Sequence, residues 1–278
     1  MNNKIGVMQG RLLPKYKEQY QAHPVGYWQD EFFLAKKIGL DCIEFILDYN
    51  DADINPLISM GGINEIQSVT ESSGVTVKTI CADYFMEAPL HSEDPIVSDE
   101  SQKILVKLLG NAYKLGVTNI VVPCVDQSTL GSQKMIDRFV DKLTPVVDIC
   151  EKFQINIALE TDLAPQPFVD LLNRFDSNRI TVNYDIGNSA ALGYNPLEEL
   201  DAYGELITDI HIKDRILGGG PVILGDGNAD FDNFFRKLEE VEFSGVFIMQ
   251  AYRDDEGVDV FNKQLEFIKV ILQKYNFI

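Results

Sequence analysis

The sequence is short of basic residues. Its 24 Lys and Arg residues stand against 43 Asp and Glu residues, which gives a formal net charge of −19 at pH 7 over 278 residues. The same excess gives a pI near 4.5. Because like charges repel, this balance opposes binding to the phosphates of nucleic acid or to an anionic lipid surface. We therefore expect neither a nucleic-acid partner nor a membrane partner.

Long apolar runs, clustered cysteines and a secretory signal are absent as well. No run reaches the ~20 apolar residues that a membrane span requires, and the opening residues MNNKIGVMQGR lack the apolar segment of a signal peptide. The 4 cysteines form no C-x-x-C pair, and Cys42, Cys81 and Cys124 lie in apolar runs, as reduced buried thiols do. These features are typical of a cytoplasmic protein.

What the chain does contain is an alternation of short apolar runs with longer stretches of helical period. No linker of Pro, Gly or Ser interrupts it, so we expect one domain over residues 1–278. Short runs rich in Val and Ile are typical of buried parallel strands. The predicted strands are Ile5–Gln9, Cys42–Leu47, Val75–Ala82, Asn119–Val125, Ile155–Glu160, Ile180–Asp185, Ile207–Lys213 and Val246–Gln250.

The stretches between these runs have the apolar spacing of helices with one buried face. The apolar residues from Leu105 to Leu115 follow that spacing and stop at Gly116, and Pro145 interrupts a second such stretch. Eight strand-and-helix units average about 35 residues each, which fits an α/β fold of the (β/α)8 TIM barrel type. A doubly wound sheet is the alternative, but the first run continues as GVMQGR and not as the G-x-G-x-x-G of that fold.

Polar residues stand at the carboxyl ends of the predicted strands, where a TIM barrel carries its chemistry. Glu160, Asp185 and His211 end three successive strands, 25 and 26 residues apart, so we expect them to converge above the barrel. Two carboxylates and an imidazole suit a divalent metal such as Mn²⁺, Zn²⁺ or Co²⁺. Gln250, one strand further, offers a neutral oxygen as a fourth ligand. Taken singly, a carboxylate at a strand end is more typical of a helix cap or an ion pair, and a lone histidine is more often hydrogen-bonded within the protein than a metal ligand; the four residues on successive strands together favour the metal site.

Several segments together resemble the sugar isomerase/epimerase family of xylose-isomerase-like TIM barrels, which includes ketose 3-epimerases and hydroxypyruvate isomerases. They are ALET from Ala158, YDIGN from Tyr184, HIKDR from His211 and LGDGNADF from Leu224. The resemblance implies that Glu160, Asp185 and His211 hold a metal together with a second glutamate. Here that fourth position is Gln250, and Asn188 stands where the family often has histidine.

The family's epimerases resemble a two-base machine, in which one glutamate removes the proton next to the ketose carbonyl and another reprotonates the opposite face of a cis-enediolate. The resemblance assigns the first role to Glu160. A glutamine does not exchange protons at neutral pH, so Gln250 is excluded as the second base. Either the reaction is a one-base isomerisation, or another carboxylate serves the second face. Glu44, Asp83 and Glu87 are the candidates by position.

Cationic residues after the seventh predicted strand are expected to face the substrate, a small sugar or sugar phosphate. We predict Lys213 as a catalytic residue beside Glu160, and Glu44, Asn188, Arg215 and Arg253 as substrate contacts. Lys213 and Arg215 are equally compatible with solvated ion pairs to Asp214 or Asp209. The glycine-rich segment 218–227 is either a phosphate cradle or a set of turns. The aromatic-rich segment 11–29 is either a lid or simple packing over the barrel mouth.

Three other functions remain open at this stage. A metal-dependent nuclease on the same barrel uses many histidines, whereas this chain has 3, and its charge opposes DNA. A lyase that dehydrates a polyol ketone would use the same metal and base. A non-catalytic sugar-binding barrel would explain Gln250 as the trace of lost chemistry. Oligomers are common in the group that the chain resembles, so a homo-oligomer is a further possibility.

Overall fold

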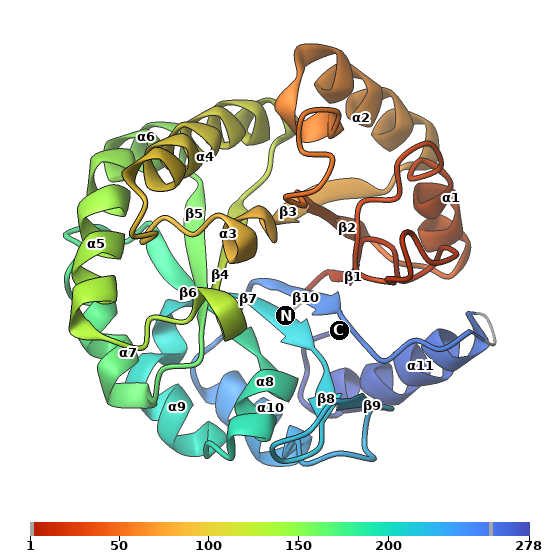
Figure 1. Ribbon diagram of the computed structural model, residues 1–278. Helices are drawn as coiled ribbons and strands as arrows, with labels where there is room; N and C mark the ends of the chain where they lie inside the picture. The colour runs from red at the N-terminus through yellow and green to blue at the C-terminus, as the bar shows by residue number, and fades with distance from the viewer. Residues whose placement is uncertain (1–2, 256–257) are drawn as a thin grey trace.

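Eight parallel strands close into a barrel in the computed structural model, which describes residues 3–255 and 258–278 (Figure 1). Their order around the ring is β1-β10-β7-β6-β5-β4-β3-β2. This confirms the predicted TIM barrel and excludes the doubly wound sheet. The strands are β1 (Ile5–Met8), β2 (Cys42–Ile46), β3 (Thr76–Cys81), β4 (Asn119–Cys124), β5 (Asn156–Thr161), β6 (Ile180–Asp185), β7 (Ile207–Ile212) and β10 (Val246–Met249).

The helices lie around the outside of this ring (Figure 1). They are α1 (Asp30–Lys37), α2 (Met60–Ser73), α3 (Tyr84–Glu87), α4 (Pro95–Leu115), α5 (Gln133–Leu143), α6 (Val147–Phe153), α7 (Pro165–Leu172), α8 (Ile186–Leu192), α9 (Pro196–Tyr203), α10 (Phe231–Glu240) and α11 (Asp259–Lys274). Single 3₁₀ turns occur at Pro56–Ile58, Asp126–Ser128, Thr144–Val146 and Gly204–Leu206. Two further strands, β8 (Asp214–Arg215) and β9 (Pro221–Val222), form a small antiparallel hairpin after β7.

Local sequence explains where the helices begin and end. The Asp94 side chain accepts a hydrogen bond from the backbone N–H of Ile96 at the start of α4, and Pro95 occupies the first helical position. The same helix ends at Gly116, whose φ of +71° is a left-handed conformation that glycine adopts without strain. Pro145 lies in the 3₁₀ turn that separates α5 from α6, which confirms the predicted interruption.

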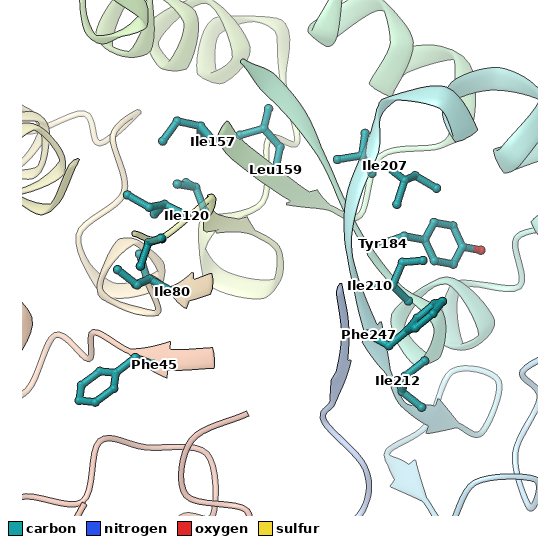
Figure 2. Packing of buried hydrophobic residues seen from close by; sticks show 14 of the residues in the cluster. Phe45, Ile80, Ile120, Ile157, Leu159, Tyr184, Ile207, Ile210, Ile212 and Phe247 are labelled. Atoms are coloured by element: carbon teal, nitrogen blue, oxygen red, sulfur yellow. The ribbon is translucent and has the colours of Figure 1, made fainter. Parts of the chain in front are cut away.

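Alternation along the strands produces two separate cores. Outward-facing residues such as Phe45, Ile120 and Phe247 pack against the helices in the larger core (Figure 2). Inward-facing residues form a small cluster inside the barrel, which consists of Met8, Cys42, Ile46, Cys81, Val121, Ala158 and Ile248. None of these inner residues lies on β6 or β7. The inner positions of those two strands are polar instead, and this asymmetry places the site on one side of the barrel.

Within residues 3–255 and 258–278, no helix combines the length and the apolar composition needed to cross a bilayer.

Candidate active site

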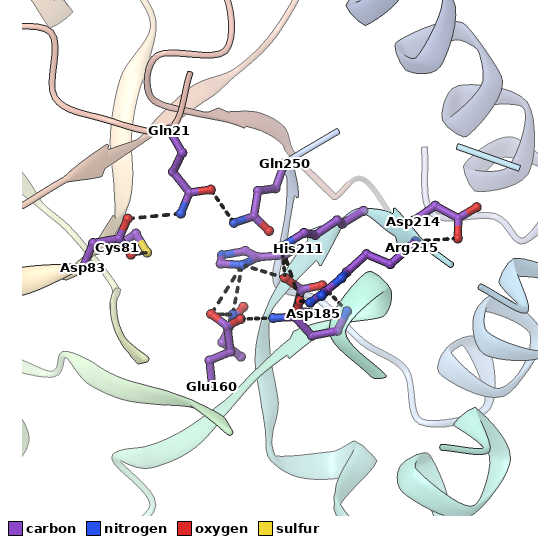
Figure 3. Close-up of polar contacts among 12 residues, drawn as sticks. Gln21, Cys81, Asp83, Glu160, Asp185, His211, Asp214, Arg215 and Gln250 are labelled. Carbon is purple, nitrogen blue, oxygen red and sulfur yellow. Dashed lines mark hydrogen bonds and ion pairs between the residues drawn. The ribbon is translucent and has the colours of Figure 1, made fainter. Parts of the chain in front are cut away.

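Glu160, Asp185 and His211 come together at the carboxyl ends of β5, β6 and β7, as the sequence predicts (Figure 3). The His211 Nδ1 atom lies 3.8 Å from Glu160 Oε2 and 3.9 Å from Asp185 Oδ2. One ligand atom from each of the three side chains lies within 4.8 Å of the other two. Their neighbouring strands impose this convergence, because β6 pairs with β7 so that Asp185 stands directly beside His211.

Burial shapes the electrostatics of this cluster. Burial, assisted by the neighbouring Asp185 carboxylate, raises the pKa of Glu160 to about 7. Burial alone lowers the pKa of His211, but the carboxylates of Glu44, Glu160 and Asp185 outweigh it and raise that pKa to about 10. The cluster therefore carries more negative charge than its single imidazole can balance, and it favours a cation.

Two asparagines fix the orientation of Glu160. The Asn188 Nδ2 group donates to Glu160 Oε1 over 2.6 Å, and Asn183 Nδ2 contacts Glu160 Oε2 at 3.3 Å and His211 Nδ1 at 3.2 Å. Asn188 stands on the first turn of α8, where its backbone N–H donates to Asp185 Oδ1 over 2.8 Å. Asp185 therefore caps α8 and also belongs to the cluster. The two roles that its place in the sequence suggested do not exclude each other.

Lys213 and Arg215 point toward the cluster and not toward Asp209 or Asp214. Lys213 Nζ lies 3.3 Å from both Asp185 Oδ2 and Asn188 Oδ1. The Arg215 guanidinium donates to the same Asn188 oxygen over 2.8 Å and to the Gly219 carbonyl over 3.0 Å. The predicted inward orientation is thus present, but the two cations already contact protein groups.

Glu44 lies below the mouth of the barrel, fully buried beneath His211. Its Oε1 atom is 2.8 Å from His211 Nε2. Asp209 is also fully buried, and burial together with the nearby Glu44 carboxylate raises its pKa well above the ordinary value. At this depth Glu44 has no access to a substrate. We therefore assign it the orientation of the imidazole instead of the predicted substrate contact, since a carboxylate that accepts from Nε2–H turns Nδ1 toward Glu160 and Asp185, where Asn183 Nδ2 also contacts it.

Gln250 directly follows β10, the strand next to β7 in the ring. Its Nε2 atom donates to Gln21 Oε1 over 2.7 Å, whereas its Oε1 atom is buried and has no hydrogen-bond partner. A buried amide oxygen without a partner is unfavourable unless something coordinates it. The unpaired oxygen and the three converging side chains fit a divalent cation, with Gln250 as a neutral fourth ligand.

A cavity of about 610 Å³ opens beside the cluster, and its wall includes Arg11, Tyr20, Gln21 and Asp83. Glu160 borders only a much smaller void of about 20 Å³. The cluster itself is therefore closely packed. Gln21 lines the larger cavity and contacts Gln250, so the cavity reaches the end of β10.

The segment between β1 and α1 builds one wall of that cavity. His23 and Trp28 pack against Phe45 of the core, with ring centroids 5.2 and 5.3 Å from it. Tyr16 and Tyr20 line the cavity instead. Some aromatic residues of this segment thus pack against the core, and others line the cavity at the barrel mouth.

Arg253 supports the same wall. Its side chain donates to the Arg11 carbonyl over 2.9 Å and lies 4.7 Å from the centre of the Tyr20 ring. The structure does not bring Arg253 together with the Glu160 cluster, and its predicted substrate contact stays a prediction.

The glycine-rich segment after β7 is organised by an internal carboxylate. Asp214 is 1% exposed, and it accepts hydrogen bonds from the backbone N–H groups of Gly225, Gly227 and Ala229 over 2.9 to 3.0 Å. These N–H groups are occupied by Asp214, so they form turns and not a phosphate cradle.

Three residues of the site escaped the sequence analysis. Asn183 is two residues before Asp185, and strand alternation was a sufficient signal to place both on the inner face. Arg11 and Gln21 lie on an irregular segment, and no periodic signal indicates where such side chains point. Arg11 is half-buried, and burial lowers the pKa of its guanidinium to about 10.

Comparison with known proteins agrees with this geometry. A family model described as xylose isomerase-like TIM barrel matches residues 32–271. The chain belongs to this family. L-ribulose-5-phosphate 3-epimerase UlaE of Salmonella paratyphi A is 26% identical over 245 residues, which cover 84% of this chain and 86% of that protein.

Solved structures share the same fold. D-psicose 3-epimerase, crystallised in the presence of D-fructose, superposes with a TM-score of 0.75 at 15% identity, over 97% of this chain and 99% of that one. The IOLI protein, crystallised with a zinc atom, gives a TM-score of 0.76 at 18% identity, over 98% of this chain and 99% of that one. The names of these relatives confirm the predicted enzyme class, an isomerase or epimerase.

Proposed function

We propose that this protein is a divalent-metal-dependent epimerase or isomerase of a ketose or ketose phosphate. The observation that carries the proposal is the convergence of Glu160, Asp185 and His211 at the mouth of a barrel of this family. The unpaired Gln250 oxygen at the end of the next strand around the ring supports it. The relative UlaE, named for L-ribulose 5-phosphate, supports a sugar phosphate as the substrate.

The residues that would hold the metal are Glu160, Asp185, His211 through Nδ1, and Gln250 through Oε1. Mn²⁺, Zn²⁺ and Co²⁺ all accept this mixed oxygen and nitrogen set. When bound, such an ion stabilises the negative charge that develops on a sugar oxygen as a neighbouring C–H bond breaks, a contribution of several kcal/mol.

Glu160 is the residue that we propose as the base. A pKa of about 7 leaves a substantial fraction of its carboxylate ionised at neutral pH, and it makes that carboxylate a stronger base than a surface glutamate. The Asn188 amide holds one of its oxygens, so the other is directed toward the metal-ligand cluster. Lys213 and Arg215 position Asn188, and Lys213 also contacts Asp185.

Product analysis tests this proposal. The protein is loaded with Mn²⁺ and incubated with L-ribulose 5-phosphate, D-psicose and D-tagatose, and each mixture is followed by NMR. We expect a new ketose or aldose of the same mass from at least one of them, and none after chelation. Loss of water would show a lyase. Sugar binding without turnover would show a binding protein.

A further inference from the structure

Asp83 is a carboxylate of the barrel mouth to which the proposed roles give no task. It follows β3 directly, after Cys81 and Ala82, and it lines the 610 Å³ cavity. Its two oxygens accept from Cys81 Sγ and from Gln21 Nε2, each over 3.1 Å (Figure 3). Burial raises the pKa of Asp83, so its carboxyl group holds a proton more readily than a surface aspartate does.

The chemistry of epimerisation requires a second proton-exchanging group. Inversion at a carbon beside a carbonyl delivers the returning proton to the face opposite the one from which the first proton left. Glu160 serves one face only. Gln250, which stands across the ring from Glu160, carries a neutral amide and exchanges no proton near neutral pH.

Asp83 stands at the same end of the barrel as Glu160. Strand register aligns Cys81 with Val121 and Val121 with Ala158. Asp83 and Glu160 each lie two residues beyond these aligned positions, so both stand at the carboxyl ends of their strands. Around the ring, Asp83 follows β3 and Glu160 lies on β5, with β4 between them.

The side-chain amide of Gln21 connects Asp83 to Gln250, which carries no carboxylate. Gln21 donates to Asp83 through Nε2 and accepts from Gln250 through Oε1, over 3.1 and 2.7 Å. The negative charge of Asp83 also reaches Glu160, whose pKa it raises. Asp83 is therefore linked to Gln250 through Gln21 and to Glu160 through its charge.

The other carboxylates predicted for this role are badly placed. Glu44 is fully buried beneath His211. Glu87 is exposed at the rim, where its Oε1 atom accepts from Gln127 Nε2 over 3.1 Å. Of the three candidates that the sequence offered, Asp83 thus combines access to the cavity with a connection to Gln250 through Gln21.

We propose that Asp83 is the second acid–base residue, which delivers a proton to the substrate carbon on the face opposite Glu160. This rests on the proposed function. Glu160 takes the proton from the carbon as the electron pair of that C–H bond moves toward the carbonyl oxygen. The Asp83 carboxyl group then gives its proton to the same carbon, and the returning electron pair forms the new C–H bond. Exchange with water resets both carboxylates.

Deuterium partitioning separates the two bases. Wild type and Asp83→Asn, both loaded with Mn²⁺, are incubated with L-ribulose 5-phosphate in D₂O, and NMR follows deuterium entry into the starting sugar and formation of its epimer. We expect Asp83→Asn to form the epimer about 100-fold more slowly or worse. Deuterium exchange in the starting sugar, which Glu160 performs alone, should stay within about threefold of wild type.

Two further variants serve as controls for the assigned role of Asp83. Asp141→Asn makes the same chemical change on the exposed face of α5 and should alter neither rate. Asp83→Asn combined with Gln250→Glu should regain at least about tenfold in epimer formation, because a carboxylate returns to the other end of the Gln21 bridge.

Three results would overturn the assignment. Asp83→Asn with epimer formation within about threefold of wild type would show that Asp83 is not required. Equal loss of exchange and of epimer formation would show that Asp83 supports the whole site and not one face. Wild type that takes up no deuterium would show that the proposed function itself is wrong, and the role of Asp83 would fall with it.

Discussion

The two sides of the barrel mouth are built differently. On β5, β6 and β7, the side chains of Glu160, Asp185 and His211 are part of the strands themselves and contact one another directly. On the opposite side, Gln250 and Asp83 follow their strands and meet only through Gln21, which belongs to an irregular segment. The first side is fixed by the barrel, whereas the second depends on one loop side chain. The placement of Glu160, Asp185 and His211 therefore needs only the barrel, whereas the placement of Gln250 and Asp83 also needs Gln21.

The largest effect is expected from removing the base on the β5–β7 side. Glu160→Gln keeps the shape of the side chain but cannot accept a proton, so we expect kcat to fall by about 10³-fold or more. Steady-state assays with Mn²⁺ and the active sugar measure this. Glu93→Gln, on the exposed surface, is the matched control. Activity of Glu160→Gln within tenfold of wild type would remove Glu160 from the mechanism.

Stabilisation by the metal should depend on the residues of the β5–β7 side and not on Asp83. Mn²⁺ at about 100 times its Kd should stabilise the wild type by about 2.7 kcal/mol, because it binds only the folded protein. Asp185→Asn, which lacks one charged ligand, should lose most of this effect, while Asp83→Asn should keep it. Thermal melting with Mn²⁺ and with EDTA measures both. Equal stabilisation of Asp185→Asn and wild type would contradict the ligand set.

The pH dependence of metal binding should follow from the His211 and Glu160 pKa values of about 10 and about 7. At pH 7 the metal-free imidazole is protonated, and the metal must displace that proton. Between pH 7 and pH 8.5 the Kd for Mn²⁺ should therefore fall about tenfold per pH unit. Calorimetry in two buffers counts the released protons. A Kd independent of pH would contradict this account.

The free energy of unfolding of the metal-free protein should fall as the pH rises, whereas the affinity for Mn²⁺ should increase. The raised pKa of His211 stabilises the folded state most below its unfolded value near 6.5, and this contribution is lost as the pH rises toward about 10. Urea denaturation with EDTA at pH 6.5 and pH 8.5 checks the sign, and an unchanged or greater stability at pH 8.5 would contradict it.

The smallest effect is expected on the loop-dependent side. Gln21→Ala removes the bridge between Gln250 and Asp83 but no charged group, so we expect kcat to fall by about three- to tenfold. The control is Gln19→Ala on the same loop, which should be neutral. An effect of Gln21→Ala as large as that of Glu160→Gln would show that both sides are equally important.

The same contrast explains what the sequence could predict. The run containing Ala158-Leu-Glu160 and the run ending in Asp185 have the length and apolar character of strands, and strand ends of a barrel meet at one mouth. The cluster of Glu160, Asp185 and His211 followed from that rule. The depth of each side chain in the barrel did not follow from the sequence. The apolar residues around Glu44 do not reveal that its carboxylate lies below His211.

Side-chain partners were also beyond the sequence. Lys213 had acidic neighbours in the chain at Asp209 and Asp214, yet it contacts Asp185 of the adjacent strand, since strand pairing brings that residue closer. The Gln21 contacts depend on the path of an irregular loop, which no period encodes.

The central claim is that the β5–β7 side holds a divalent metal and moves a proton through Glu160. Its most direct test is deuterium uptake by L-ribulose 5-phosphate in D₂O, measured by NMR with the Mn²⁺-loaded wild type. We predict deuterium at a carbon beside the carbonyl, with none after chelation or in Glu160→Gln. Uptake that persists in the chelated protein, or in Glu160→Gln at the wild-type rate, would contradict the account.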